Sequence, residues 1–290
     1  MKIGVVFPQT EIGTDFGIIR SYVQTAEHLG YQNILAYDHV IGADTKNRPG
    51  WTRYSLKDSF FEPLTLFSYF AALTSSINLT TGIIILPQRQ TVLVAKQAAV
   101  LDVLSNGRLQ LGVAVGWNHV EFEALGENFN NRGSRIEEQI AILRALWTQD
   151  SLSFSGKWHN ISEAGINPLP IQQPIPIWFG GGMTDNPKVL QRIARVADGW
   201  ILNQQANKGA ELAIANMKSY LSEIGRDPKK FGFDGRVSLA DGIDSAVKLT
   251  KQWKEIGATQ VNLNTMNSNL HSPEEHIKAI QAYKAALDSI

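Results

Sequence analysis

The stretch 176-PIWFGGGMTDNP-187 joins a short β-prone run, three consecutive glycines and a helix start. Residues 175–179 predict a strand, which glycines 180–182 end. Asp185 or Asn186 is a candidate N-cap, and Pro187 suits the first helical position. Bare backbone before a helix N-terminus exposes amide N–H groups, and the helix dipole favours a bound phosphate. The stretch alone is equally consistent with a flexible turn that binds nothing.

The order helix, glycine, strand recurs along the chain. Residues 15–29 place apolar side chains on one helical face, Gly30 ends that helix, and an apolar strand follows. The same order recurs after the predicted helices 92–104, 189–197 and 245–256. The eight predicted strands cover residues 3–7, 33–37, 79–86, 108–115, 175–179, 200–203, 232–239 and 259–264. Such alternation favours an α/β fold, a single (β/α)₈ TIM barrel over residues 1–290, more than a doubly wound sheet.

Two segments interrupt the alternation, one after the second strand and one after the fourth. Residues 41–61 are polar and rich in turn formers, and they follow a strand end, where barrel enzymes hold substrate. We therefore expect a substrate or lid loop there. Residues 152–176 form the other insertion, which we expect to contain a small hairpin over 152–161 and a proline-rich connector over 168–176.

Composition excludes several classes of function. Lys plus Arg and Asp plus Glu both number 27, so no global charge attracts nucleic acid or an anionic membrane. Cysteine is absent, which excludes disulfides, thiolate nucleophiles and Cys-ligated zinc. Met1 leads directly into a predicted strand, and no apolar run approaches membrane-spanning length. We expect a cytoplasmic protein with neither nucleic-acid nor membrane partners.

The residues at the predicted strand ends indicate chemistry that depends on a cofactor. A barrel enzyme carries its site beyond the C-terminal ends of its strands. These ends carry amides, aromatic rings, glycines and one acid–imidazole pair, with neither a carboxylate cluster nor a histidine cluster for a metal. A Gly-x-Ser-x-Gly elbow, a Walker pattern and a Gly-x-Gly-x-x-Gly fingerprint are also missing. A phosphate-binding loop without nucleophiles therefore suggests that a cofactor carries the reaction.

His39 is the best titratable candidate. An imidazole can donate or accept a proton near neutral pH, and Asp38 could set its tautomer or raise its pKa. Adjacent strand residues point to opposite faces, so direct contact requires the strand to have ended before Asp38. The alternative is a histidine that is only hydrogen-bonded at a strand end.

Gly82 is unusual because it lies inside a predicted strand. Glycine there weakens a strand and often marks a bulge or the close approach of a ligand. Packing against a large neighbouring side chain is the alternative explanation.

The chain resembles the bacterial luciferase-like superfamily. The heart of the likeness is 81-TGIIILPQRQTVLVAKQAAVLDVLSNGRLQLGVAVGW-117, and its specific part is the block 95–125. The likeness continues through 121-EFEALG-126, 131-NRGSR-135, 177-IWFGGG-182 and 197-ADGW-200. The stretches 235-GRVSLAD-241 and 263-LNTM-266 resemble the subgroup of F420-dependent oxidoreductases. The likeness spans nearly the whole chain.

The resemblance implies a barrel that binds deazaflavin F420, or alternatively FMN, at the strand C-termini. It places Asp38 and His39 near the cofactor ring, with His39 as the proton donor or acceptor. It places a cis non-proline peptide and a supporting bulge at Gly82 and Ile83. The implied cofactor contacts are Gly82, Ile83, Asn118, Gly180, Gly181, Gly182 and Met183. Some relatives carry a glutamate beside the ring where this chain reads 114-AVG-116, which disfavours a sugar-phosphate dehydrogenase.

Three functions follow from the resemblance. The first is hydride transfer between F420 and a small organic substrate. The second is an FMN-dependent monooxygenase that uses reduced flavin and O₂, with a flavin or F420 reductase as a partner. The third is a cofactor-binding barrel without catalytic activity. The resemblance also implies a homodimer.

Overall fold

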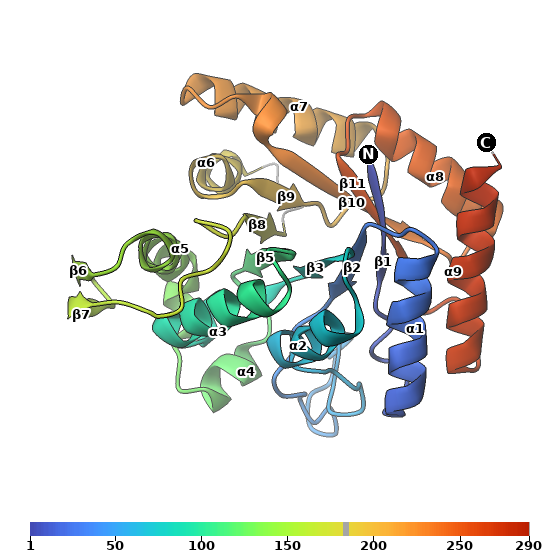
Figure 1. The fold of residues 1–290 in the computed structure, drawn as a ribbon, viewed down its shortest axis with the longest axis horizontal. Helices are drawn as coiled ribbons and strands as arrows, with labels where there is room; N and C mark the ends of the chain where they lie inside the picture. The colour runs from blue at the N-terminus through green and yellow to red at the C-terminus, as the bar shows by residue number, and fades with distance from the viewer. Residues whose placement is uncertain (182–185, 290) are drawn as a thin grey trace.

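A computed structural model describes residues 1–181 and 186–289 of the chain. Within these residues, parallel strands close into a barrel surrounded by helices, which confirms the predicted (β/α)₈ architecture (Figure 1). The neighbours run β3–β2–β1–β11–β10–β9–β8–β5–β4, and a further pairing of β3 with β5 closes the ring. The barrel strands are β1 (Lys2–Val6), β2 (Asn33–Ala36), β3 (Asn78–Thr81), β4 (Ile84–Ile85), β5 (Leu109–Ala114), β8 (Ile177–Gly180), β9 (Gly199–Ile201), β10 (Gly232–Ser238) and β11 (Gln260–Asn264).

The third predicted strand is interrupted, so the expectation of one continuous strand over 79–86 is wrong. Its halves β3 and β4 both pair with β5, but the register changes by one residue between Leu79↔Leu109 and Ile84↔Val113. The extra residue forms a bulge at Gly82 and Ile83, whose peptide bond is cis. A Cβ at Gly82 would collide with the Leu35 side chain, so the close-packing explanation for this glycine holds.

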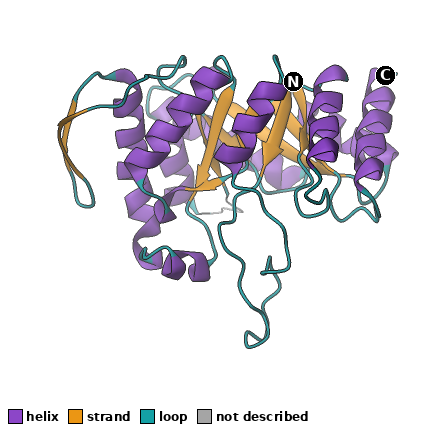
Figure 2. Ribbon diagram, turned by 60° about the horizontal axis from the view of Figure 1, so that its bottom comes forward, coloured by secondary structure: helices purple, strands orange, loops and turns teal. Residues whose placement is uncertain are grey.

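Helices cover the outside of the barrel, as Figure 2 shows from the side. They are α1 (Phe16–His28), α2 (Pro63–Leu73), α3 (Thr91–Leu104), α4 (His119–Ala124), α5 (Arg132–Thr148), α6 (Pro187–Val196), α7 (Lys208–Glu223), α8 (Ile243–Glu255) and α9 (Pro273–Asp288), with 3₁₀ turns η1 (Leu86–Gln88), η2 (Phe129–Asn131) and η3 (Pro228–Lys230). Asn186 caps α6 and Pro187 begins it, as predicted; Asp185, the other candidate cap, lies outside the described residues. None of the described helices combines the length and hydropathy needed to cross a bilayer.

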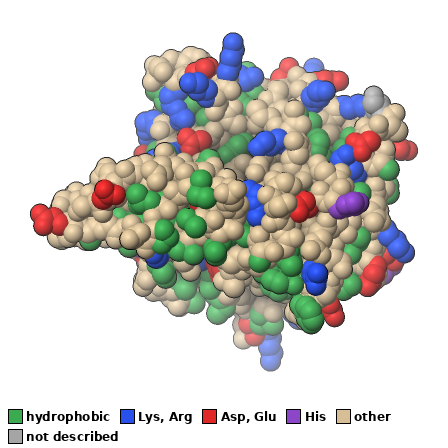
Figure 3. Space-filling view, in the orientation of Figure 1, with side chains coloured by type: hydrophobic (Ala, Val, Ile, Leu, Met, Phe, Trp, Pro, Cys, Tyr) green, Lys and Arg blue, Asp and Glu red, His purple; other side chains and the backbone are tan. Residues whose placement is uncertain are grey.

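The two insertions lie at different places. Residues 41–61 form a long loop beyond one end of the barrel, opposite to the end where both termini lie (Figure 2). The hairpin of β6 (Leu152–Ser155) and β7 (Asn160–Ala164) projects from the side of the molecule after α5, so the second insertion follows the helix after the fourth barrel strand. Basic and acidic side chains both occur across the face shown in Figure 3.

The barrel interior has an apolar layer and a polar layer. Val6, Leu35 and Met266 form a small cluster that is separate from the main core between strands and helices. Asp234 and Asn262 belong to a buried polar group, in which the Asn262 amide donates to both Asp234 oxygens at 2.8 and 2.9 Å. Burial raises the pKa of the Asp234 carboxyl from 3.8 to about 6.

Asp234 makes the stability of the barrel pH-dependent. Its pKa is higher in the folded than in the unfolded chain, so its stabilising contribution is complete below pH 3.8 and is lost as the pH rises through about 6. We expect the free energy of unfolding of the wild type, relative to Asp234→Asn, to fall by about 2–3 kcal/mol between about pH 4 and about pH 7. Urea unfolding at several pH values measures this, with exposed Asp241→Asn as the control. A constant difference between wild type and Asp234→Asn would contradict the assignment.

Candidate active site

A cavity of about 470 Å³ opens at the C-terminal ends of the barrel strands. Its walls come from the segment after β2, loop 41–61, the β3–β4 bulge, and the ends of β5, β8, β9 and β10. The lining residues are Tyr37, Asp38, His39, Arg53, Tyr54, Gly82, Ile83, Ile85, Ala114, Val115, Gly116, Trp117, Gly180, Gly181, Ile201, Asn203 and Arg236. Barrel closure therefore brings His39, the bulge and the first two glycines of the triple-glycine stretch to one cavity.

The His39 imidazole is held by Glu121, the third residue of α4. Nδ1 of His39 lies 3.1 and 3.2 Å from the two Glu121 oxygens, and the histidine side chain is 10% exposed. An ionised carboxylate only accepts hydrogen bonds. We therefore assign the ring proton to Nδ1, which donates to Glu121. Nε2 has no hydrogen bond to any described residue. The arrangement leaves this second ring nitrogen available to exchange a proton with a bound molecule.

Aromatic rings enclose the same imidazole. Its centroid lies 4.8 Å from that of Phe60, 5.2 Å from Tyr54 and 5.6 Å from Trp117. Two of these rings belong to loop 41–61, which therefore forms one wall of the cavity around His39. Together with Glu121, the rings fix the orientation of His39.

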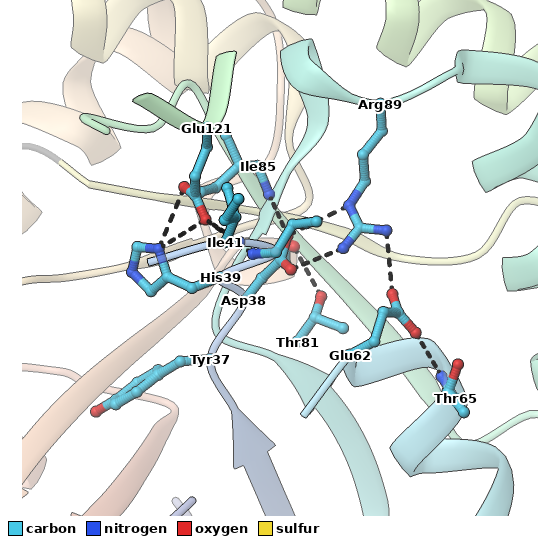
Figure 4. Close-up of polar contacts among 12 residues, drawn as sticks. Tyr37, Asp38, His39, Ile41, Glu62, Thr65, Thr81, Ile85, Arg89 and Glu121 are labelled. Carbon is cyan, nitrogen blue, oxygen red and sulfur yellow. Dashed lines mark hydrogen bonds and ion pairs between the residues drawn. The ribbon is translucent and has the colours of Figure 1, made fainter. Parts of the chain in front are cut away.

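Asp38 has a separate set of partners (Figure 4). The strand β2 ends at Ala36, so strand geometry does not force the side chains of Asp38 and His39 to opposite faces. The two side chains nevertheless point away from each other. Asp38 Oδ2 accepts from Ile85 N at 3.0 Å, and Oδ1 accepts from Arg89 Nη2 at 2.7 Å. Glu121, rather than Asp38, is the carboxylate that contacts the imidazole.

The Asp38–Arg89 pair continues to a helix start. Arg89 Nη1 donates to Glu62 Oε1 at 3.0 Å, and Glu62 caps α2 by accepting from Thr65 N at 2.7 Å (Figure 4). Burial raises the pKa of the Asp38 carboxyl, and the hydrogen bonds from Arg89 and Ile85 N oppose that rise. Asp38 thereby ties the segment after β2 to β4, beside the bulge.

The bulge and the glycine stretch pack directly against each other. A Cβ at Gly180 would collide with the side chain of Ile83, so only glycine allows this approach. Gly181 has φ of +112°, a conformation that favours glycine, and a Cβ there would meet no atom of a described residue within 4 Å. Its N–H donates to Ile201 O at 3.3 Å, and its carbonyl accepts from Trp200 Nε1 at 2.7 Å. Both backbone hydrogen-bonding groups of Gly181 are therefore occupied by residues of β9.

Asn118, one of the predicted contact residues, does not line the cavity. It is buried and caps α4, where its Oδ1 accepts from Val120 N at 3.1 Å. Gly182 and Met183 lie outside the described residues.

Sequence reasoning missed the roles of Glu121, Arg89 and Arg236, although each lies within a stretch quoted for its likeness. The signal for Arg236 is a charged residue inside a predicted strand, 232-GFDGRVSL-239, which also carries Asp234. Glu121 follows the fourth barrel strand in a short helix that periodicity did not predict.

The described residues contain no group of three or more His, Asp or Glu side chains suited to a metal ion.

Removing the carboxylate at position 121 will destabilise the site. Glu121→Ala leaves His39 Nδ1 and the N–H of Val40, which donates to Glu121 at 2.8 Å, without their acceptor. We expect a loss of about 2–3 kcal/mol in the free energy of unfolding, measured in urea. Glu123→Ala, on an exposed position of the same helix, should change it by less than about 0.5 kcal/mol. Equal losses in the two variants would show that Glu121 does not hold the segment.

Two sequence relatives span much of the chain. An uncharacterized protein of Mycobacterium tuberculosis is 31% identical over 261 residues, which cover 88% of this chain and 87% of the relative. An FMNH₂-dependent dimethylsulfone monooxygenase of Pseudomonas putida is 27% identical over 234 residues, 78% of this chain and 60% of that enzyme.

Solved structures share the fold over their whole length. Monooxygenase RslO1 from Streptomyces bottropensis superimposes with a TM-score of 0.82 at 16% identity, covering 100% of this chain and 99% of that one. An F420-dependent secondary alcohol dehydrogenase superimposes with a TM-score of 0.76 at 16% identity, covering 97% and 98%. The family model described as luciferase-like monooxygenase matches residues 1–288. The chain therefore belongs to the luciferase-like monooxygenase family.

Proposed function

We propose that this protein is an oxidoreductase that transfers a hydride between coenzyme F420 and a small organic substrate. The observation that carries the proposal is the shared cavity: His39, the Gly82–Ile83 bulge and Gly180 all line it. Membership of the family supports a flavin-type cofactor, and the F420-dependent secondary alcohol dehydrogenase shares the fold at a TM-score of 0.76.

The cavity residues fit a flat ring that carries a phosphate-bearing tail. Ile83 lies in the bulge between β3 and β4, and its side chain packs on the bare backbone of Gly180 at the end of β8. Among the described residues, Gly181 leaves open space beside it, because none of their atoms stands within 4 Å of where its Cβ would be. We place the ring on the bulge and the phosphate beside Gly181, before the N-terminus of α6.

His39 would hold or deliver the proton that accompanies hydride transfer. The bound deazaflavin would supply or accept the hydride. Glu121 fixes the proton on Nδ1, so Nε2 is the atom that exchanges a proton with the substrate or ring. Loop 41–61 contributes Arg53 and Tyr54 to the wall, and we propose that it acts as the substrate loop.

An FMN-dependent monooxygenase is the second candidate. The FMNH₂-dependent dimethylsulfone monooxygenase of Pseudomonas putida, a sequence relative, supports it. This reading uses the same cavity and the same imidazole, but it needs reduced flavin from a partner reductase. The two candidates differ in cofactor and in oxygen consumption.

Cofactor titration tests the proposal. We expect F420 to bind with a change in its absorbance, FMN to bind more weakly, and reduced F420 to drive no oxygen consumption. Gly181→Val should weaken cofactor binding at least about tenfold by filling the space beside the glycine. The control is Gly242→Val, which places a valine at a φ of +86° with equally open surroundings, and it should leave affinity unchanged. Oxygen uptake with FMNH₂ alone would favour the monooxygenase, and binding of neither cofactor would refute both functions.

His39 should matter for turnover rather than for cofactor affinity. We expect His39→Ala to lower turnover of the loaded enzyme by about 10²–10⁴-fold, because the proton-exchanging group is lost. The dissociation constant of the cofactor should change less than about threefold. His119→Ala is the control. This exposed imidazole does not line the cavity, and its ring centroid lies 5.8 Å from that of Trp51. A large loss of affinity with unchanged turnover would contradict the proposed role.

A further inference from the structure

Arg236 and Tyr37 line the cavity with hydrogen-bond donors that are mostly unused. Arg236 extends inward from β10, and its Nη1 donates to the Tyr37 hydroxyl oxygen at 3.0 Å. An arginine side chain carries five N–H donors, and described residues accept only this one. The Tyr37 oxygen is an acceptor in this bond, so its own proton remains to be donated, and no described residue accepts it. Arg236 and Tyr37 therefore present to the cavity several donors that no described residue accepts.

The positive charge of Arg236 acts on the buried carboxyl of Asp234, whose pKa it lowers, but Arg236 forms no direct ion pair with a described residue. No carboxylate among the described residues lies within ion-pair distance of its guanidinium. Asp234, two residues earlier on the same strand, accepts from Asn262 and Gln260 instead. Asp38, the acid that lines the cavity, is bound by Arg89. The guanidinium is held 5.0 Å over the Tyr37 ring, a contact that orients the charge without neutralising it.

A second guanidinium stands at the entrance. Arg53, an exposed residue of loop 41–61, lies 4.9 Å over the Trp117 ring and forms no ion pair with a described residue. It lines the same cavity as Arg236. Both cations are thus positioned by aromatic rings, one at the entrance and one deeper in the cavity.

We infer that the substrate is a small organic acid whose oxyanion, a carboxylate or a sulfonate, binds to Arg236 and the Tyr37 hydroxyl. A planar arginine fork can donate two parallel hydrogen bonds to such a group, and its partly buried charge strengthens them. A neutral carbonyl or hydroxyl oxygen would accept weaker hydrogen bonds from these donors and would not offset the charge of Arg236, which costs affinity. Arg53 adds attraction at the entrance. The inference deepens the proposed function, on which it rests, by naming the substrate class.

The position of Tyr37 connects this anion site to the imidazole. Tyr37 and His39 are two residues apart, and Figure 4 shows their side chains extending to the same side of the segment. Both line the cavity. An acid anchored at Arg236 therefore occupies the space that His39 also faces.

Matched probes test the anion site. We would titrate butyrate, butane-1-sulfonate and the neutral butyramide into the protein by calorimetry, both cofactor-free and loaded with cofactor. We expect each anion to bind at least about tenfold more tightly than the amide. Arg236→Gln should abolish that preference and leave cofactor affinity within about threefold. Arg53→Gln should weaken anion binding less, about two- to threefold, with a stronger effect at low salt.

Two further variants separate the site from general damage. Tyr37→Phe removes only the hydroxyl and should lower anion affinity by about three- to tenfold even if Arg236→Gln folds poorly. Arg20→Gln changes an exposed arginine of α1 and should have no effect. Equal binding of butyrate and butyramide would overturn the inference. So would an Arg236→Gln variant that loses cofactor affinity but keeps the anion preference. Absence of cofactor binding would refute the proposed function alone, because the cofactor-free titration still decides the anion site.

Discussion

A buried carboxylate in the first turn of α4 fixes the imidazole of His39, which lines the cavity. Glu121 accepts from His39 Nδ1 and from the N–H of Val40, so it sets both the ring orientation and the course of the chain into loop 41–61. The adjacent Asp38 points away from His39 and accepts a hydrogen bond from Arg89. Two neighbouring residues thus serve different purposes, one presenting a ring nitrogen to the cavity and the other fixing the segment to β4.

Close backbone approach is the second constraint. The bulge at Gly82 and Ile83 fits between Leu35 and Gly180, and at both glycines a Cβ would collide with a neighbouring side chain. These contacts place an apolar surface next to His39 in one cavity. Interlocked packing of this kind resists rearrangement, so this part of the cavity wall is rigid.

The sequence predicted the barrel because its signals are local. Apolar runs, glycine stops and caps such as Asn186 depend on a few neighbouring residues, and the structure follows them. The split of the third strand could not be read from periodicity, since it depends on register against β5. The partners of His39 and Arg236 come from distant segments, which only barrel closure brings together. The placement of His39 with the first glycines of the 180–182 stretch was predictable for the same reason as the fold, because both follow strand ends.

The central claim is that a flat redox ring lies on the bulge within reach of the imidazole. A crystal structure of the protein loaded with the cofactor it binds tests this most directly. The account predicts the ring on Gly82 and Ile83, with His39 Nε2 at about 3 Å from a polar atom of the ring or of a bound organic acid. A ring bound outside this cavity, or one from which His39 is screened by other side chains, would contradict the account.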